Sequence, residues 1–371
     1  MPPKGSKKKT VAPASPAKEK EVSTEPKPTK RTKAEGGADA KTTKAAEARA
    51  ANAEVTTPVR RQSSGGGPVV TEEAAFAGTT AFERITKDAD FDASTMLRIV
   101  SWNVAGLRGF INKGGDLDKF CQVEKPDILC LQETKLSDPA DCAKIGAISG
   151  YSHVDNISTA KKGYSGTRTY VRDGLTTAKP VHAFSFDINK PDECDAEGRI
   201  VTTALADLAD LTIVNTYVPN SGMTLDRLGY RTNTFDPQMR GFLKSIPWQD
   251  SVVWTGDLNV AERDYDRFWG GNFKSMQKSP GFTPEERASF RTTLQDCKMV
   301  DAFRLKYPAA AKAGTYTFFS ARFNQRAKGN GWRLDYFVVS AALAARVVDC
   351  FPLTPYADSD HQPLVMWLRR K

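Results

Sequence analysis

The chain has 371 residues and a formal net charge of +9, which is enough sequence for one large domain or two ordinary ones. No apolar stretch approaches the length that a membrane-spanning helix needs, so we expect no transmembrane segment. The six cysteines show no paired spacing, which argues against a secreted disulfide scaffold and favours reduced thiols inside the cell.

The first 70 residues are predicted to be a disordered basic tail. They contain no Phe, Tyr, Trp or Cys, so they cannot bury enough apolar surface to offset the entropy lost on ordering. Their fifteen Lys and Arg outnumber seven Asp and Glu, and this excess of eight accounts for nearly all of the chain's charge. Such an arm binds polyanions. The alternative is that the tail only keeps the protein soluble.

The same tail bears on the location of the protein in the cell. Lys7-Lys8-Lys9 and Lys30-Arg31 are candidate nuclear import signals. No apolar segment follows the lysines, so a secretory signal is not expected. An acid-poor start also suits a mitochondrial presequence, but prolines interrupt it and Lys prevails over Arg. We therefore expect a nuclear protein, with the mitochondrion as the alternative.

A glycine run at 65–67 is predicted to be a hinge between the tail and residues 71–95, which we expect to form a linker or a short helix. Helical spacing of apolar residues predicts a helix over 224–245. Thr283 before Pro284 and two glutamates predicts another helix over 283–294. Short apolar or alternating runs predict strands at 97–104, 127–132, 167–171, 200–206, 211–218, 252–256, 315–319, 334–339, 346–350 and 363–368.

These elements predict one α/β domain over residues 96–371. Ten strands with helices between them exceed one small sheet, and two sheets packed face to face with helices outside would account for them. No internal repeat and no glycine-rich dinucleotide or P-loop motif is present.

Polar side chains follow the apolar run at the end of several predicted strands. Such positions lie on loops at the edge of a rigid scaffold, where sites are commonly built. Turn chemistry alone also favours Asn and Asp, but six such ends with carboxylate, amide or imidazole groups indicate one shared site. The segments are 101–103, 131–133, 217–220, 256–259, 333–336 and 358–361.

These side chains suit metal-assisted hydrolysis of a phosphodiester. Carboxylate and amide oxygens are the ligands that Mg²⁺ prefers, usually with one or two carboxylates from the protein. A His paired with an Asp can polarise or protonate an oxyanion, and an Asp beside an Asn can hold a water and take its proton. Together these groups describe a metal-dependent hydrolase.

Seven motifs lie in order between about residue 97 and the C-terminus: Ser-Trp-Asn-Val (101–104), Pro-Asp-Ile-Leu-Cys-Leu-Gln-Glu-Thr-Lys (126–135), Gly-Tyr-Ser-Gly (163–166), Gly-Asp-Leu-Asn-Val (256–260), Gly-Phe-Thr-Pro-Glu-Glu-Arg (281–287), Gly-Trp-Arg-Leu-Asp-Tyr-Phe (331–337) and Ser-Asp-His (359–361). In combination they resemble the exonuclease III family of AP endonucleases, in its eukaryotic branch. Gly-Asp-Leu-Asn alone recurs throughout the wider endonuclease/exonuclease/phosphatase superfamily. The resemblance implies a four-layered α/β sandwich of the DNase I-like kind.

The resemblance also implies roles for single residues. Glu133 would hold the metal, and Asp257 would accept the proton of the attacking water while Asn259 orients that water. His361, held by Asp335, would stabilise the charge that develops on the phosphate. The implied metal ligands are Asn103, Glu133, Asp257, Asn259 and Asp360. The implied catalytic residues are Tyr217, Asp257, Asn259, Asp335 and His361.

A further set of residues is implied to contact DNA. Tyr217 and Asn220 would bind phosphate oxygens, while Phe318 and Trp332 would line the pocket for a flipped-out abasic sugar, which has no base to accommodate. Plain core packing is the alternative for both aromatic residues. The implied DNA-binding residues are Arg108, Lys135, Tyr164, Asn220, Arg227, Phe318 and Trp332.

The activity that the resemblance implies is that of an apurinic/apyrimidinic endonuclease of base excision repair, which cuts the phosphodiester 5′ to an abasic site in duplex DNA. The same site would serve as a 3′-phosphodiesterase and a 3′→5′ exonuclease. Mg²⁺ is the expected cofactor, with Mn²⁺ as a substitute. The expected partner is double-stranded DNA with abasic sites or blocked 3′ ends. We expect a monomer without membrane association, with other repair proteins as further partners.

Two positions depart from the family pattern. Ala105 stands where relatives carry Asp or Asn, so an auxiliary metal contact is missing. Met223 replaces an Arg that enters the duplex beside the lesion in eukaryotic relatives, so we expect a weaker grip on the duplex. Short insertions around 268–278 leave the loop there unassigned.

Two other functions fit parts of the sequence. Another phosphoesterase of the superfamily, such as a deadenylase, an inositol phosphatase or a sphingomyelinase, would share the metal-binding and water-activating residues but not the motif at 331–336. A catalytically inactive DNA-binding or scaffold protein would be expected to lack Glu133, Asp257, Asn259 or His361, and all four are present.

Overall fold

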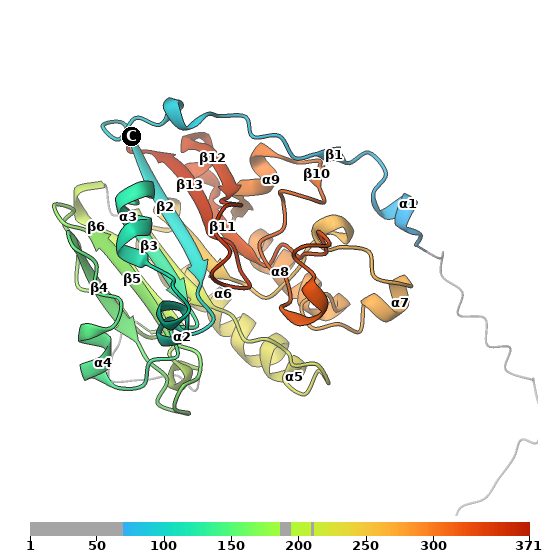
Figure 1. Ribbon diagram of the computed structural model, residues 1–371, viewed down its shortest axis with the longest axis horizontal. Helices are drawn as coiled ribbons and strands as arrows, with labels where there is room; N and C mark the ends of the chain where they lie inside the picture. The colour runs from blue at the N-terminus through green and yellow to red at the C-terminus, as the bar shows by residue number, and fades with distance from the viewer. Residues whose placement is uncertain (1–69, 186–193, 209–210) are drawn as a thin grey trace, which may run out of the picture. The chain divides into compact units, whose positions relative to one another are not determined.

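The computed structural model describes residues 70–185, 194–208 and 211–371 (Figure 1). All of them belong to one compact unit, Gly65–Lys371. The predicted tail up to residue 69, its import signals and the glycine hinge lie outside the described residues. Within the described ranges, no helix is long and apolar enough to cross a membrane.

One sheet is built from six strands, in the spatial order β12 (Val347–Pro352), β13 (Leu364–Arg369), β2 (Met96–Asn103), β3 (Ile128–Gln132), β5 (Thr167–Arg172) and β4 (Tyr151–Asn156). β2 and β3 run parallel, with Asn103 opposite Gln132. The other neighbours are antiparallel. The carboxyl ends of β2 and β3 therefore reach the same edge of the sheet.

The second sheet has five strands, in the spatial order β6 (Ile200–Leu205), β7 (Leu211–Tyr217), β8 (Val252–Asp257), β11 (Asp335–Ser340) and β9 (Met299–Asp301). β7 and β8 are parallel, with Tyr217 opposite Asp257. β11 is antiparallel to β8, with Asp335 opposite Asp257. Three predicted site residues thus stand side by side at one edge.

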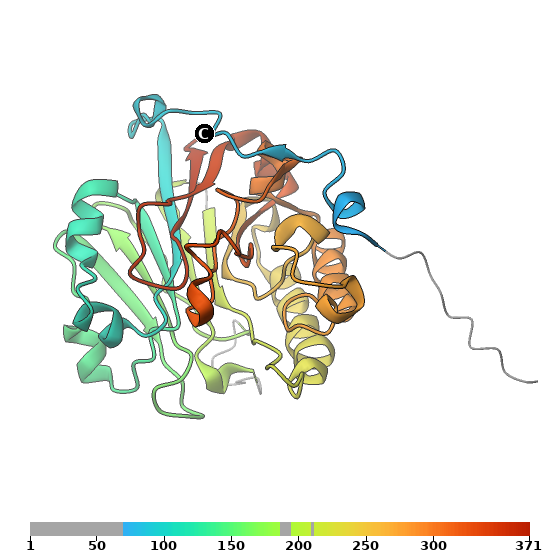
Figure 2. The same ribbon diagram turned by 45° about the vertical axis from the view of Figure 1, so that its right-hand side comes forward.

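The alternation of side chains along the strands builds four layers. Ile99 of β2 and Val253 of β8 share one apolar cluster between the sheets. Trp102 and Trp254 point the other way, into clusters under the helices on either side. Because successive side chains of a strand point to opposite faces, each sheet is buried on both. Figure 2 shows helices outside both sheets, so the predicted four-layered α/β sandwich is confirmed.

Short helices cover the outer faces of the sheets. Thr283 caps α8 and Glu286 completes its capping box, which confirms the predicted start of that helix. The helices outside the first sheet are α2 (Leu107–Asn112), α3 (Leu117–Glu124) and α4 (Pro139–Lys144), and those outside the second are α6 (Asp236–Ser245) and α8 (Pro284–Asp296). The other short elements are α1 (Glu72–Ala75), α5 (Leu228–Tyr230), α7 (Phe273–Met276), α9 (Ala302–Lys306), and the paired β1 (Thr80–Ala81) and β10 (Ala310–Ala311).

The helix predicted over 224–245 is confirmed from residue 228 to residue 245, but 224–227 are not helical and a π-helical turn interrupts the α-helix. The structure has α5, then a π-helical turn over Arg231–Phe235, and then α6. Pro237 has no N–H to donate and its ring crowds the preceding turn, and a widened turn relieves that conflict. Arg231 is only 2% exposed as a result of its place in this turn.

The strand predicted over 315–319 is wrong, because these residues join neither sheet in the part of the chain that is described. Phe318 instead forms isolated bridges with Trp332 and with His361. β4 and β9 were not predicted, since β4 has mostly half-buried polar residues and β9 has three residues. Neither shows the apolar run that indicates a buried strand.

Residues 76–95 pack against the domain and run along its edge to β2 (Figure 1). The Phe82 ring lies edge-on to that of Tyr307, with centroids 4.9 Å apart. Arg84 bonds to Asp349, whose side chain is fully buried. The sequence predicts a domain boundary at residue 96, because this segment has too few apolar residues to form a periodic pattern.

A chain that begins at residue 96 should melt about 5 °C or more below one that begins at residue 70. It loses the packing of Phe82 and the hydrogen bonds that Arg84 and Thr86 donate to Asp349, and breaking a buried hydrogen-bonded network is destabilising. Calorimetry of both chains beside the full chain measures the difference, with Phe82→Ala as an intermediate case. Equal melting temperatures would show that the segment adds nothing to stability.

Candidate active site

Strands of both sheets end at a common edge, and several predicted site residues lie there. Asn103 ends β2, Glu133 follows β3, Tyr217 ends β7 and Asp257 ends β8. Asn103 connects the two sheets, since its side-chain amide donates to Glu133 Oε1 at 3.0 Å and to Asp257 Oδ2 at 2.9 Å. The structure therefore brings the predicted carboxylates and amide into one hydrogen-bonded group.

Asp257 lies at the centre of this group and is 2% exposed. Its Oδ1 accepts a hydrogen bond from the backbone N–H of Asn259 at 3.0 Å, and its Oδ2 accepts one from the Asn259 side chain at 3.3 Å. Burial raises the pKa of Asp257 to about 7, against the opposing charge of His361. A carboxyl group that is held on both oxygens and titrates near neutrality is suited to take a proton from water.

His361 faces Asp257 from the other side of the edge. Its Nδ1 lies 2.8 Å from Asp335 Oδ2, and its Nε2 lies 3.8 Å from Asp257 Oδ2. Burial alone would lower the pKa of His361, but the charges of Asp335 and Asp257 outweigh burial and raise it to about 10. The imidazole is therefore a cation at neutral pH, with Nε2–H available to an anionic oxygen.

Asp257, Asp335 and His361 offer ligand atoms within 4.8 Å of one another. Hydrogen bonds already occupy part of this set, because Asp335 Oδ2 lies 2.8 Å from His361 Nδ1 and Asp257 Oδ2 accepts from the Asn103 amide. The three residues are better described as a group that accepts, donates and orients protons.

Glu133 has the features of a cation ligand at the mouth of the site. Its side chain is 20% exposed, and Oε2 pairs with Lys135 Nζ at 2.9 Å. Burial would raise the pKa of Glu133, but the charge of Lys135 outweighs burial and lowers it, so this carboxylate is ionised. Tyr217 also hydrogen-bonds to it. A partly exposed carboxylate that already faces a cation, next to the Asn103 amide, fits a divalent metal ion.

Asp360 is half-buried and lines a cavity of about 390 Å³. Ala105, Lys113 and Arg326 line the same cavity. Within the described ranges no hydrogen bond or ion pair joins Asp360 to Glu133. The hydroxyl of Ser359 lies 2.7 Å from the Asn103 carbonyl and 3.3 Å from Asp360 Oδ1, so Asp360 is linked to Asn103 through Ser359. The small side chain of Ala105 leaves the cavity open.

Four non-glycine residues around the site have positive φ angles: Ala105 (51°), Glu133 (51°), Lys135 (53°) and Asn259 (48°). Each such conformation costs on the order of 1 kcal/mol and persists only where the surrounding structure imposes it. Their concentration here indicates a functional edge. No feature of the sequence marks Glu133 or Lys135 for this conformation.

Arg231 and Glu286 support the loop that carries Asn259. Arg231 donates to the backbone carbonyl of Leu258 at 2.7 Å and to that of Asn259. Glu286 accepts from Arg231 at 3.2 Å and from the hydroxyl of Ser221 at 2.5 Å. This fully buried ion pair ties the loops after β7 and β8 together. Sequence reasoning missed it, because charged residues in helices are usually on the surface.

Tyr164 and Arg227, both predicted to bind DNA, meet next to a buried arginine that was not predicted. The Tyr164 hydroxyl accepts from Arg227 and, at 2.8 Å, from Arg199. Arg199 also donates to the backbone carbonyl of Tyr217 at 2.9 Å, and Arg227 pairs with Glu197 at 2.9 Å. Arg199 therefore links the predicted DNA contacts to the site. It lies in no recognisable motif.

The remaining predicted DNA contacts are dispersed. Asn220 donates to Asn259 Oδ1 at 2.9 Å, so it belongs to the central group. Arg108 pairs with Asp141 of α4 at 2.7 Å on the surface, and no contact joins it to the central group in the described structure. Met223 is 78% exposed on the loop after β7.

Phe318 and Trp332 are half-buried, and Phe318 lies next to His361. The Phe318 ring and the imidazole have centroids 4.9 Å apart. The main chains of Phe318 and Trp332 exchange two hydrogen bonds of 2.8 Å. Both rings are partly buried and pack against a small apolar cluster that contains Phe282 and Leu334.

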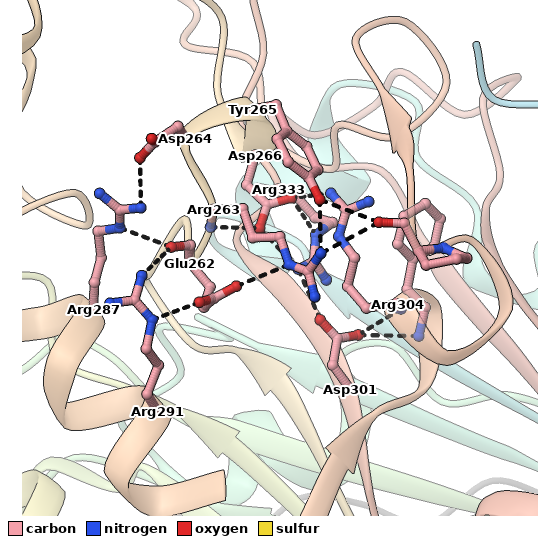
Figure 3. A network of polar contacts seen from close by, with 12 residues as sticks. Glu262, Arg263, Asp264, Tyr265, Asp266, Arg287, Arg291, Asp301, Arg304 and Arg333 are labelled. Carbon is pink, nitrogen blue, oxygen red and sulfur yellow. Dashed lines mark hydrogen bonds and ion pairs between the residues drawn. The ribbon is translucent and has the colours of Figure 1, made fainter. Parts of the chain in front are cut away.

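A network of ion pairs holds the loop at 262–267 against the start of β11 (Figure 3). Asp266 is fully buried and accepts from Arg333 at 2.9 Å on both oxygens and from Arg304. Arg333 also pairs with Asp301 at 2.8 Å. Burial would raise the pKa of Asp266, but Arg333 and Arg304 outweigh burial and hold that pKa well below its usual range.

Asp266→Asn should lower the free energy of unfolding by about 3–5 kcal/mol at pH 7, because it leaves buried guanidinium groups without their partner. Asp264→Asn is the matched control, since Asp264 pairs with Arg287 at a side-chain exposure of 30% and should cost about 1 kcal/mol or less. The folded pKa of Asp266 is depressed, so its contribution is complete above its unfolded pKa of about 4 and declines as pH falls toward the folded value. Urea unfolding from pH 7 to 3 measures both effects. A loss that does not change with pH would contradict the ionic explanation.

Known sequences agree with this geometry. The sequence profile of the Endonuclease/Exonuclease/phosphatase family matches residues 100–361. The chain is 41% identical over 273 residues to the DNA repair nuclease APEX1 of Danio rerio, which covers 73% of this chain and 82% of that protein. It is 38% identical over 270 residues to a DNA-(apurinic or apyrimidinic site) endonuclease of Dictyostelium discoideum, covering 72% of this chain and 69% of that protein.

Solved structures share the arrangement. The AP endonuclease LMAP of Leishmania major aligns with a TM-score of 0.76 and 47% identity, over 81% of this chain and 96% of that one. An AP endonuclease of Archaeoglobus fulgidus aligns with a TM-score of 0.59 and 26% identity, over 73% of this chain and 98% of that one.

Proposed function

The chain belongs to the Endonuclease/Exonuclease/phosphatase family, and from this membership and the geometry of its site we propose that it is an AP endonuclease of base excision repair. It would cut the phosphodiester 5′ to an abasic site in duplex DNA, and the same site would act on blocked 3′ ends and as a 3′→5′ exonuclease. The observation that carries the proposal is the 47% identity to the AP endonuclease LMAP over 81% of this chain. The geometry agrees with it, because Asp257 Oδ2 faces His361 Nε2 across 3.8 Å.

The residues divide the reaction between them. Asp257 takes the proton of the attacking water, and Asn259 fixes the orientation of that carboxylate while one lone pair of its own amide oxygen remains for the water. His361 donates Nε2–H to a phosphate oxygen as negative charge develops there, and Asp335 keeps the imidazole charged and oriented. Asn220, which donates to Asn259, would bind a phosphate oxygen of the DNA backbone.

Glu133 and Asp360, with Asn103 beside them, would hold a divalent cation, for which we propose Mg²⁺ with Mn²⁺ as a substitute. When bound, such an ion would supply positive charge to the phosphate oxygens. Glu133 is suited to this because it is ionised and partly exposed. Ala105 has no side-chain oxygen, so fewer side-chain ligands are available than in relatives with Asp or Asn there.

The test is a single-turnover gel assay on two duplexes that differ by one abasic site. We expect incision 5′ to the abasic site and no internal incision of the intact duplex. Hydrolysis of a phosphomonoester or a lipid headgroup, without incision of the abasic duplex, would instead support another phosphoesterase of the family. Binding without incision would support an inactive DNA-binding protein.

We also propose that residues 1–69 act as a nuclear DNA-binding arm and that the enzyme works as a monomer. The excess of basic residues in this segment supports binding to phosphate. A chain that begins at residue 70 should keep its turnover on saturating substrate but bind undamaged DNA with a shallower salt dependence.

Cell fractionation with and without the segment tests the nuclear location against the mitochondrial one.

A further inference from the structure

Arg267 is buried beside the site without an acidic partner. It is 4% exposed, and no ion pair joins it to a carboxylate within the part of the chain that the structure describes. Its guanidinium donates to the carbonyls of Phe268 at 3.2 Å and Met276 at 3.4 Å, and to the hydroxyl of Ser279 at 3.4 Å. Burial lowers the pKa of Arg267 to about 10, so it stays charged at neutral pH. An unpaired buried charge opposes folding, so this one calls for a functional explanation.

Aromatic rings surround the guanidinium in place of an acid. Its central carbon lies 3.9 Å from the centroid of Trp332, 5.1 Å from that of Phe282 and 5.4 Å from that of Phe268. A cation over a ring face is attracted by the negative face of the ring, most strongly for Trp and when water is excluded. Arg267 therefore occupies one face of the half-buried Trp332 ring.

Main-chain bridges connect this arginine to the reacting groups. Arg267 is bridged to Trp332, Trp332 to Phe318, and Phe318 to His361. The ion pairs of Asp266 hold the segment just before Arg267 against the start of β11 (Figure 3). The segments that carry Arg267, Trp332, Phe318 and His361 are thus paired in that order, with Arg267 at one end and the catalytic imidazole at the other.

We propose that Arg267 is a specificity-determining residue that fixes Trp332 as a rigid wall of the site and so favours a sugar without a base over a complete nucleotide. This inference rests on the proposed function. An apolar side chain that can change its rotamer excludes a nucleotide base only weakly. Strong discrimination against the base requires a side chain whose conformation is fixed by its own neighbours. The guanidinium supplies that lock, because it covers a ring face while the main-chain bridge holds the Trp332 backbone.

The experiment compares two rates on matched duplexes: incision at an abasic site, and removal of an undamaged 3′ nucleotide at a nick. Arg267→Met keeps an unbranched chain without the charge, a replacement that cores often tolerate. It should lower the ratio of abasic to undamaged rates roughly tenfold, whereas Arg267→Lys should retain most of the ratio. Trp332→Ala should also lower the ratio. Adding Arg267→Met to Trp332→Ala should change it no further, because the arginine acts through the ring.

Arg287→Lys is the matched control. The Arg287 guanidinium lies 4.5 Å from the Phe282 centroid but pairs with Asp264 and does not cover Trp332, so the ratio should stay unchanged. Arg267→Gln gives the same comparison should Arg267→Met fail to fold.

The inference would be overturned if Arg267→Met lowered the abasic and the undamaged rate equally. It would also be overturned if the effects of Arg267→Met and Trp332→Ala on the ratio were fully additive. Arg267 would then be only a structural support. An unchanged ratio in Arg267→Met, with normal abasic incision by the natural chain, would refute this inference alone. Absence of abasic incision by the natural chain would refute the proposed function, and this inference with it.

Discussion

Asp257→Asn should slow a single turnover on an abasic duplex by at least ~10²-fold, the lower range for a general base. The substitution keeps the size of the side chain but removes the group that takes the proton of water. It also replaces one of two oxygens that accept from Asn103 and Asn259 with an N–H donor. Affinity for the duplex should be unchanged or slightly higher, because a negative charge near the phosphate is gone. Single-turnover rates beside a binding titration on one duplex measure both quantities.

Three variants give this result its meaning. His361→Asn should also slow the chemical step, because the cation that faces the phosphate is lost. Asn220→Ala should weaken binding and chemistry together, since a positioning hydrogen bond is removed. Asp296→Asn should change neither, because Asp296 pairs with Lys244 at the surface. The assignment of Asp257 as base fails if Asp257→Asn raises only the dissociation constant and leaves the single-turnover rate intact.

Chelation of divalent metal by EDTA should abolish incision, and Mg²⁺ or Mn²⁺ should restore it. Glu133→Gln should then need a metal concentration about tenfold higher, or more, to reach half of its maximal rate. Losses of this size are seen when even a supporting partner of a metal ligand is removed. The reason is that Glu133 is the ionised, partly exposed carboxylate at the mouth of the site. Calorimetric titration of each protein with Mg²⁺ gives a measure that does not depend on turnover.

Glu124→Gln is the control for the metal titration, since Glu124 pairs with Arg98 at the opposite end of β2 from Asn103. It should require the same metal concentration as the natural chain. Full incision in EDTA would rule out a metal-dependent reaction. A normal metal requirement in Glu133→Gln would move the metal site to other residues, with Asp360 as the first to test.

The sequence by itself determined the fold class and the central residues of the site, because both depend on patterns within short stretches of the chain. A strand buried on both faces leaves an apolar run, and the residue at its end is therefore visible, as with Asn103, Glu133 and Asp257. Parallel pairing then brings such ends to one edge. The motif around His361 could be recognised for the same reason, since its residues are adjacent in the chain.

The tertiary structure alone decided which charged residues are buried. Charged residues are usually exposed to solvent and are rarely buried unless paired, so the sequence alone gives no sign that these are buried. The buried ones are Arg199, Arg231, Asp266, Arg267 and Glu286. Three of them find their ion-pair partners far away in the sequence: 67 positions separate Asp266 from Arg333, and 55 separate Arg231 from Glu286.

The same holds for the N-terminal segment and for the aromatic wall. Phe82 packs against Tyr307, which lies far from it along the chain, and no periodic pattern surrounds Phe82. Arg267 meets Trp332 only because two irregular segments pair through an isolated bridge. A local pattern reports the face that a residue presents, whereas the partner that makes a buried charge tolerable is chosen by packing between distant parts of the chain.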